Sequence, residues 1–343
     1  MLSSNNIHVL LFSALFFNYR SAVRISGQTL SSSTREEYMS TTAGFDYPCI
    51  PVLGFAVVSD PMRFTSRLID SIDFCVQQLV IVHAREYNFW GHNRIPLYSQ
   101  IKNVTIIKHR HSVIGVSESW NIILKSFPAA PWYLVSAYDV LFLPDQLKLF
   151  SYRFWRRSGL AIPVYDGSGN AGKVTLLSNV NFAHTRWANM PGGKGFNLFA
   201  LSREVIENCG YFDENIFPAF WEDRDYKVRL LLWSAAKVKT FSNIRPLHGL
   251  LNDTDYKTGT KYLDGSWHNL MSASHEFNVD YILSKWGCER KESLRRFDLI
   301  NCTFTRPFNV SENNLSHWKL DATRIDKLRK VHENELQKRV LNI

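Results

Sequence analysis

An aspartate follows directly after an apolar run in the segment YLVSAYDVLFLPDQL, residues 133–147. This residue is Asp139, and the run before it, residues 132–137, is typical of a buried strand. Ligands of open α/β sheets bind beyond the carboxyl ends of the strands, so we expect the carboxylate of Asp139 to face a ligand crevice. There it can hold a hard cation, Mn²⁺ or Mg²⁺, against a diphosphate. The alternative is that Asp139 only starts a turn ahead of Pro144.

A cluster of acids opens an amphipathic segment in FDENIFPAFWEDRDYKVRLLLW, residues 212–233. The acids are Glu222, Asp223 and Asp225. Acids in the first turn of a helix interact favourably with its macrodipole, by about 0.3 to 1 kcal/mol each, and this explains part of the cluster. A carboxylate beside the aromatic pair Phe220 and Trp221 also suits a general base that removes a proton from a sugar or protein hydroxyl.

Two further polar residues stand at the ends of apolar runs. Ser59 ends VLGFAVVS, residues 52–59, and His83 ends the run that begins at Leu79. Their positions alone make them candidates for ligand contacts. The sequence contains neither GxGxxG nor GxxxxGK[ST], so it indicates neither a dinucleotide-binding Rossmann domain nor a P-loop.

The elements that must position these residues are short apolar runs alternating with amphipathic stretches. The predicted strands are 52–59, 79–83, 104–108, 132–137 and 196–201. The predicted helices are 62–76, 117–126 and 222–233. This alternation predicts an α/β fold, with a mainly parallel sheet flanked by helices in a single large domain.

The composition agrees with a globular protein. Of 343 residues, 45% are hydrophobic and 14% aromatic, which supplies a large core and excludes a mainly disordered chain. The formal net charge is +9, but Lys and Arg are scattered among acids. Because no zinc-finger spacing or RNA-binding signature accompanies this charge, we expect no nucleic-acid partner.

Taken in order, several segments resemble the family 2 type of GT-A glycosyltransferases, over about residues 50–310. GVSESWN resembles the segment ending in Asn that precedes the metal-binding strand, and YDVLFLPDQL resembles the DxD region. GFNLFALSREVIENCGYFDENIFPAFWEDRDYKVRL resembles the acceptor-side block ending in a Glu-Asp pair. RPLHG resembles the downstream His segment, and YILSKWGCERKE with RPFN resembles the closing KWGG and PFN signature.

The resemblance implies a GT-A (Rossmann-like) fold, a nucleotide-sugar donor and a divalent cation, Mn²⁺ or Mg²⁺. By this resemblance Asp139 is a metal ligand and His248 is a second contact to metal or pyrophosphate. Asp223 is the general base, and Glu222 supports it. Ser59, His83, Asn121 and Asp139 are the residues that fall where the family binds the nucleotide and its cofactor.

The implied reaction is an inverting transfer of a hexose or pentose to a hydroxyl of a glycan or glycoprotein. The sequence departs from the family pattern where Ser136, Ala137 and Tyr138 stand in place of an earlier acid, and where Cys288 replaces the second Gly of KWGG. A catalytically inactive GT-A domain that binds carbohydrate or acts as a scaffold is therefore an alternative. A nucleotidyltransferase is a third, disfavoured because a Gly-rich phosphate loop is missing near Gly54.

The apolar run near the amino end predicts a targeting segment. The uncharged run IHVLLFSALFF, residues 7–17, has the length of a signal-peptide h-region, although no Lys or Arg precedes it. A short membrane anchor and a buried strand are the alternatives. We expect a signal peptide or short anchor in residues 1–25, a flexible stem in 26–48, the GT-A domain in 49–310 and an amphipathic helical tail in 311–343. Five N-x-[ST] sequons agree with the secretory pathway, in the Golgi or ER lumen.

The remaining cysteines and histidines suggest structural roles. Cys288 and Cys302 are the first pair to test for a disulfide, because they lie close together in a segment with sequons. His109 and His111 are interpreted as structural or exposed, since no carboxylate lies at a spacing that would pair them. Trp286 and Trp221 fall inside the resemblance motifs and are candidates for stacking on a sugar.

Overall fold

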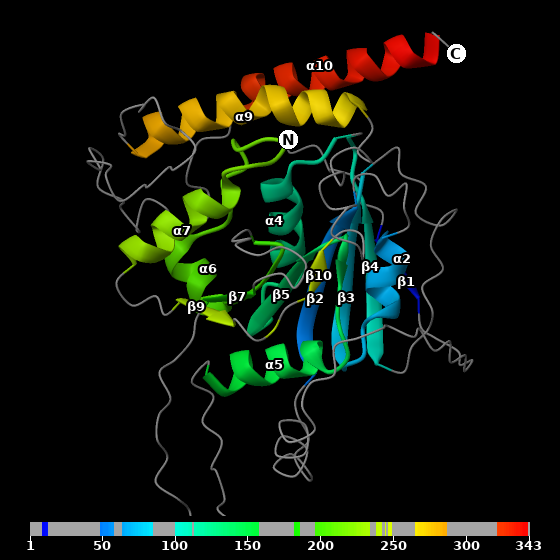
Figure 1. The fold of residues 1–343 in the computed structure, drawn as a ribbon, viewed down its shortest axis with the longest axis vertical. Coiled ribbons are helices and arrows are strands. Elements are labelled where there is room, and N and C mark those ends of the chain that lie inside the picture. The colour runs from blue at the N-terminus through cyan, green and yellow to red at the C-terminus, as the bar shows by residue number, and fades with distance from the viewer. Residues whose placement is uncertain are drawn as a thin grey trace, which may run out of the picture.

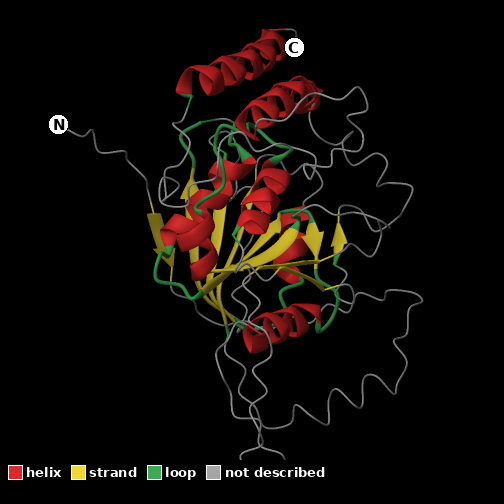
Figure 2. Cartoon of the chain, turned by 90° about the vertical axis from the view of Figure 1, so that its left-hand side faces the viewer, coloured by secondary structure: helices red, strands yellow, loops and turns green. Residues whose placement is uncertain are grey.

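The computed structural model describes residues 9–12, 49–57, 64–84, 100–111, 113–157, 182–185, 196–233, 238–241, 244, 246–248, 265–286 and 321–341. Within these residues an eight-stranded sheet carries helices on both faces, and a two-stranded sheet lies beside it (Figures 1 and 2). The large sheet is formed by β1 (Val9–Phe12), β2 (Ile50–Val57), β3 (Val76–His83), β4 (Ile101–Lys108), β5 (Trp132–Ala137), β7 (Phe182–Thr185), β8 (Leu198–Ser202) and β9 (Val238–Phe241). The small sheet pairs β6 (Val140–Leu141) with β10 (Leu247–His248).

The strand order of the large sheet is β1-β4-β3-β2-β5-β8-β7-β9. Its centre, β4-β3-β2-β5, is parallel, whereas β8 runs antiparallel to both β5 and β7. The helices are α2 (Phe64–Asp70), α4 (Val116–Ser126), α5 (Gln146–Arg157), α6 (Arg203–Cys209), α7 (Glu222–Leu232), α9 (Gly265–Trp286) and α10 (Ala322–Leu341). This architecture confirms the predicted α/β class with a mainly parallel, helix-flanked sheet.

One predicted boundary is wrong. The helix expected over residues 62–76 ends at Asp70, because Val76 already belongs to β3 and pairs with Ile50. The apolar spacing at Ile72 and Val76 continued the helical period by coincidence, since Ile72 lies in the turn and Val76 in a strand.

Side chains alternate between the two faces of the sheet, as in any pleated strand, and each face has its own core. In β2, Leu53, Phe55 and Val57 join the core on the side of α2 and α5. Val52 joins the core on the side of α4, α6 and α7. Apolar runs such as IPVLGFAV, without polar alternation, are therefore strands buried on both faces.

The contact between α4 and β2 requires a glycine. A Cβ on Gly54 would lie 2.3 Å from Cγ2 of Ile123, closer than two carbon atoms can approach without displacement. The close approach holds α4 on the centre of the sheet, with its first turn at the carboxyl ends of the strands.

Two long helices extend beyond one end of the sheet, where α10 packs against α9 (Figure 1). A third apolar cluster joins α9, through Val279 and Ile282, to Ile216 and to Val228 of α7. Within the predicted tail, residues 311–343, the structure has the helix α10, which buries Leu328.

The disulfide of the described chain joins Cys49 to Cys75, at the starts of β2 and β3. The sequence did not predict this pair, because 26 residues separate the two cysteines and the parallel pairing of the strands brings them together. Cys209 is a buried free thiol. The predicted pair Cys288 and Cys302 lies outside the described residues.

The apolar run near the amino end contributes β1, which pairs antiparallel with β4 at the edge of the sheet. The expected processing of residues 1–25, the stem and the domain boundaries stay predictions. Among the residues that the structure describes, no helix is both long and apolar enough to cross a membrane.

Candidate functional site

A cavity of about 490 Å³ opens at the carboxyl ends of β2 and β5, a size typical of small-molecule sites. Its sheet side has small side chains, including Ala56, Ser136 and Ala137. Its other walls come from the starts of α4 and α7 and from His275 of α9. The remaining lining residues are Ile114, Val116, Ser119, Trp120, Tyr138, Phe196, Asn197, Ala219, Phe220, Trp221, Glu222, Asp223 and Arg224. Parts of the chain more than 150 residues apart in sequence thus meet at the position that the strand ends predicted.

Glu222 is the more perturbed of the two candidate catalytic carboxylates. Its Oε2 atom is buried and has no hydrogen-bond partner in the described part of the chain. Burial, and to a smaller degree the charge of Asp223, raise the pKa of Glu222 to about 8. A buried, unsatisfied carboxyl oxygen in a cavity is unfavourable for stability and is typical of a group that meets a ligand.

Asp223 also lines the cavity, but its surroundings are more polar. Its Oδ2 atom lies 3.4 Å from Nζ of Lys227, one helical turn further along α7. The ammonium of Lys227 lies 4.8 Å from the ring centre of Phe196, another residue of the cavity wall. The two adjacent carboxyls therefore have different environments, because Asp223 has a cation nearby and Oε2 of Glu222 has no hydrogen-bond partner in the described part of the chain.

Asp139 follows the cavity residue Tyr138 and is half-buried in the turn between β5 and β6. The small sheet pairs the backbone of His248 with Val140, so His248 lies across from the residue that follows Asp139. The turn of Asp139 and the strand of His248, 109 positions apart in sequence, thus lie next to each other in the small sheet.

The predicted nucleotide contacts have different outcomes. His83 lies at the carboxyl end of β3, as expected, but it is buried outside the cavity wall and contacts the carbonyl of Ala84 at 3.0 Å through Nδ1. Ser59 lies outside the described residues. Asn121 is directed away from the cavity: its Nδ2 donates to the carbonyl of Phe212 at 2.8 Å, and its Oδ1 accepts from the same residue's amide at 2.8 Å. We therefore correct the role of Asn121 from ligand binding to holding the loop before α7 on α4.

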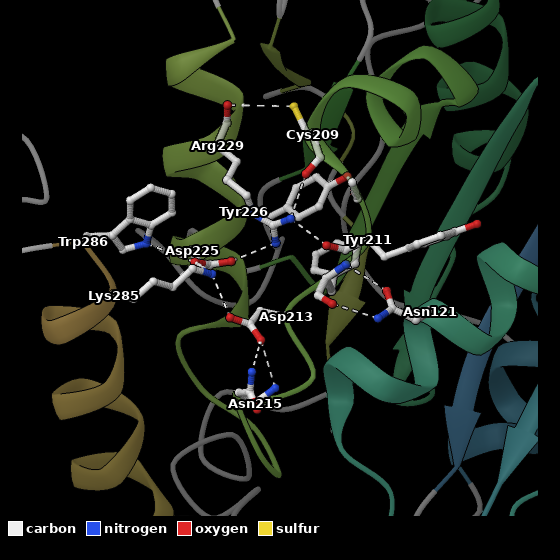
Figure 3. A network of polar contacts seen from close by, with 12 residues as sticks. Asn121, Cys209, Tyr211, Asp213, Asn215, Asp225, Tyr226, Arg229, Lys285 and Trp286 are labelled. Atoms are coloured by element: carbon white, nitrogen blue, oxygen red, sulfur yellow. Dashed lines mark hydrogen bonds and ion pairs between the residues drawn. The ribbon is translucent and has the colours of Figure 1, made fainter. Parts of the chain in front are cut away.

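A buried network of four charges supports the start of α7 (Figure 3). The side chains of Asp213, Asp225, Arg229 and Lys285 are each at most 1% exposed. Asp225 lies 2.8 Å from NH2 of Arg229 and 2.5 Å from Nζ of Lys285, which also lies 2.7 Å from Asp213. Two carboxylates balance two cations, so the buried set is neutral.

The network joins three segments that the sequence presents as separate motifs. Trp286 of α9 donates from Nε1 to Asp225 of α7 at 3.0 Å, so the KWG and WEDRD segments meet directly. Arg229 donates to the carbonyls of Cys209 and Tyr211 at 2.8 and 2.6 Å. Burial alone would raise the pKa of Asp213, but the ammonium of Lys285 lowers it overall. Trp286 is consequently a structural residue, and its predicted stacking on a sugar is wrong.

The aromatic residues before α7 adopt an unusual backbone. Phe220 and Trp221 have φ values of 72° and 82°, in the left-handed region that side chains with a Cβ disfavour. Asn278 of α9 holds this backbone, because its Nδ2 donates to the carbonyls of Ala219 and Phe220 at 2.9 and 3.3 Å. Consecutive residues in this region are typical of sites where surrounding structure imposes a conformation for function.

A second polar cluster ties α10 to α4. Glu118 of α4 accepts from NH2 of Arg329 at 2.8 Å and lies 3.1 Å from Nε2 of His109. Burial opposes ionisation of Glu118, but His109 and Arg329 together lower its pKa to about 2. The interpretation that His109 has no carboxylate partner is therefore wrong, because the fold supplies one nine residues away.

Sequence reasoning missed several residues of the cavity. Arg224 lies with its guanidinium 4.7 Å from the ring centre of Trp221, and His275 lies 5.5 Å from the same ring. Arg224 belongs to the WEDRD segment and had a local signal, whereas His275 lies on α9 ahead of the YILSKWG motif, in a stretch that no motif marked.

Comparisons with known proteins give structural likenesses only. No protein-family model matches the chain, and no curated protein matches it. The glucosyl-3-phosphoglycerate synthase from Mycobacterium tuberculosis in complex with Mg²⁺ and uridine-diphosphate has a TM-score of 0.42 at 10% identity, over 78% of this chain and 87% of that chain. S. aureus TarS 1-349 in complex with UDP-GlcNAc has a TM-score of 0.42 at 12% identity, over 84% and 92%. The mannosyltransferase PcManGT from Pyrobaculum calidifontis, in complex with GDP-Man and Mn²⁺, has a TM-score of 0.40 at 12% identity, over 67% and 69%. At these values the likeness assigns neither a family nor an activity to the chain.

Proposed function

We propose that the chain is a nucleotide-sugar-dependent glycosyltransferase of the GT-A type, which transfers a sugar to a hydroxyl acceptor with inversion at the anomeric carbon. One observation carries the proposal. A single cavity at the carboxyl ends of the central strands is lined by Tyr138, the residue before Asp139, and by Glu222 and Asp223 at the start of α7. Acids from two separate segments at one site suit separate tasks at the leaving group and at the attacking hydroxyl.

The residues around the β5–β6 turn fit a divalent cation that is bound partly by the protein and partly by a diphosphate. Within the described chain no group of three or more His, Cys, Asp or Glu side chains is placed to hold a metal ion. Mg²⁺ and similar cations are commonly held by only one or two carboxylates together with substrate phosphates and water. Asp139 would supply the carboxylate, and His248, on the adjacent strand, a further contact. A bound cation supplies charge stabilisation to the departing diphosphate.

The proposed reaction is a single displacement. Asp223 takes the proton from the acceptor hydroxyl while that oxygen forms a bond to the anomeric carbon. The bond between the anomeric carbon and the diphosphate oxygen breaks at the same time, and the electron pair leaves with the nucleoside diphosphate. Glu222, protonated at neutral pH because its pKa is about 8, lies beside Asp223 without adding a second negative charge.

The expected location in the secretory pathway has one structural support. A disulfide between Cys49 and Cys75 forms and persists in an oxidising compartment, such as the ER lumen, and is rare in the cytosol. We propose passage through that compartment. Mass spectrometry of the protein from its native cell, without reduction, should find the two cysteines linked.

The proposal is tested by nucleoside diphosphate release from UDP- and GDP-sugars in the presence of Mn²⁺ or Mg²⁺. Asp223→Asn should lower kcat about 10²- to 10⁴-fold, because it removes proton transfer. Its affinity for the nucleoside diphosphate should stay within about twofold. Asp139→Ala should instead weaken binding of the cation and the nucleotide together. Asp70→Asn, an exposed acid at the end of α2, is the matched control. If neither Asp223→Asn nor Asp139→Ala changes the activity, the assignment is contradicted.

A carbohydrate-binding protein without transferase activity is the alternative, favoured by the missing acid before Asp139. The same assay separates the two. A chain that binds the nucleotide sugar but releases no diphosphate, with or without an acceptor, supports the binding function.

A further inference from the structure

Phe220 is a large, exposed apolar residue that lines the cavity, two positions before the first of the candidate catalytic carboxyls. Its side chain is 42% exposed, whereas the neighbouring Trp221 is 6% exposed and is covered by the guanidinium of Arg224. The free aromatic surface of this wall therefore belongs to Phe220. Exposure of an aromatic ring in a cavity is unfavourable without a ligand, because apolar surface remains in contact with water.

The fold fixes Phe220 in this exposed position. Its φ of 72° is disfavoured for a residue with a side chain, and two hydrogen bonds from the buried side chain of Asn278 restrain the local backbone. The ring also contacts His275 of α9 edge-on, with centroids 5.9 Å apart. A disfavoured conformation that exposes an apolar ring, held by a buried polar residue, indicates that the position of this ring is required for binding.

The position of Phe220 assigns it to the acceptor side of the cavity. Ala56 and Ser136 line the cavity at the ends of β2 and β5, where ligands of open α/β sheets bind, so we expect the donor there. Phe220 lines the same cavity from the segment before α7, two and three positions before Glu222 and Asp223. The attacking hydroxyl must reach these carboxyls, so the rest of the acceptor must lie against the surface beside them.

We propose that Phe220 forms an acceptor subsite that takes the apolar face of a pyranose ring, so that the acceptor is a glycan. The proposal rests on the proposed glycosyl transfer, whose acceptor it specifies. A pyranose combines a face of C–H groups with a rim of hydroxyls. The face stacks on the ring of Phe220, and the rim meets the carboxyls of Glu222 and Asp223 and the guanidinium of Arg224. A serine or threonine hydroxyl on a peptide offers no such face.

The first test measures transfer to methyl β-D-galactopyranoside, methyl β-D-glucopyranoside and methyl α-D-mannopyranoside, beside a Gly-Ser-Gly peptide. Phe220→Ala should raise the KM of the accepted glycoside about 10- to 100-fold, while hydrolysis of the donor by water stays within about twofold. Phe220→Tyr keeps the ring and should restore the wild-type KM. Phe277→Ala removes an exposed phenylalanine of α9 that does not line the cavity, and it should behave as wild type.

A second test measures binding without turnover, by saturation-transfer difference NMR with the same methyl glycosides. Wild type and Phe220→Tyr should saturate the ring protons of a glycoside, and Phe220→Ala should lose the signal. If this pattern holds while no sugar nucleotide is turned over, the subsite stands and the proposed transferase activity fails. If transfer occurs but Phe220→Ala leaves KM and binding unchanged, or the peptide alone accepts the sugar, the transferase stands and the subsite is refuted. Failure of wild type to bind any of the glycosides also refutes the subsite.

Discussion

Asp225→Asn should strongly destabilise the fold without removing a single group that lines the cavity. The substitution keeps the shape of the side chain and removes one negative charge from a neutral set of two carboxylates and two cations, all at most 1% exposed. The cations that lose their counter-charge are Arg229 and Lys285, at 2.8 and 2.5 Å. Removing one partner of a buried ion pair costs about 3 to 5 kcal/mol, because the remaining charge stays desolvated.

This magnitude is large against the total stability of a domain, about 5 to 15 kcal/mol. At about 2 to 4 °C per kcal/mol, the melting temperature should fall by roughly 6 to 20 °C. Thermal unfolding followed by circular dichroism measures the shift. Diphosphate release should fall as well, since Asp225 lies in the same helical turn as Glu222 and Asp223.

The chain contains a matched control for burial. Arg203 and Glu207 form an ion pair with the same i to i+4 spacing at 2.7 Å, but their side chains are 54% and 55% exposed. Glu207→Gln should cost at most about 1 kcal/mol, because water solvates the remaining charge. In the double variant Asp225→Asn with Lys285→Met the buried set is neutral again. It should lose less unfolding free energy than the two single variants lose in sum. A loss below about 1 kcal/mol for Asp225→Asn would refute the reasoning from buried charge.

Three further predictions concern stability. Burial and a neighbouring carboxylate raise the pKa of Glu222 to about 8, so the folded chain keeps a proton there that the unfolded chain releases above about pH 4.5. Glu222 should therefore lower the free energy of unfolding as the pH rises from about 4.5 to 8. Thermal melting at pH 5 and 8.5 measures this loss, and Glu222→Gln should not show the contribution of Glu222 to it. Gly54→Ala should cost about 1 to 3 kcal/mol in urea unfolding, because its Cβ meets Ile123, and Ile123→Ala in the same chain should recover part of the loss. Replacing Cys49 and Cys75 together by Ala should cost about 2 to 4 kcal/mol in the same assay, and no change in the midpoint would mean that the link does not restrict the unfolded chain.

Local patterns in the sequence were sufficient for most elements near the site. The predicted strand at residues 132–137 matches β5 at both ends, and the predicted helix from Glu222 begins where α7 begins. Both rest on signals contained in a few neighbouring residues, which are an apolar run and a group of acids at a helix start. The helix α9, which supplies His275, Asn278 and Lys285, was not predicted because its apolar residues do not follow one face.

The roles of individual polar residues depended on partners far away in sequence. Asn121 was expected at the ligand, but the loop at Phe212 occupies its amide, 91 positions along the chain. Asp225 looked like another acid of the helix start, yet the fold buries it against Lys285, 60 positions away. No local sequence pattern indicates these distant partners, because such hydrogen bonds and ion pairs form only after the elements have packed.

The sequence by itself determined the class of the fold and the end of the sheet where the cavity opens, since buried parallel strands and the residues at their carboxyl ends are local features. The tertiary structure alone decided which acids face the cavity and which support it. Glu222 and Asp225 are three positions apart on one helix, but a turn of 3.6 residues and the packing of α9 leave one at the cavity and the other in a neutral buried network. The physical reason is that burial and charge balance are properties of a packed environment, which several distant segments create together.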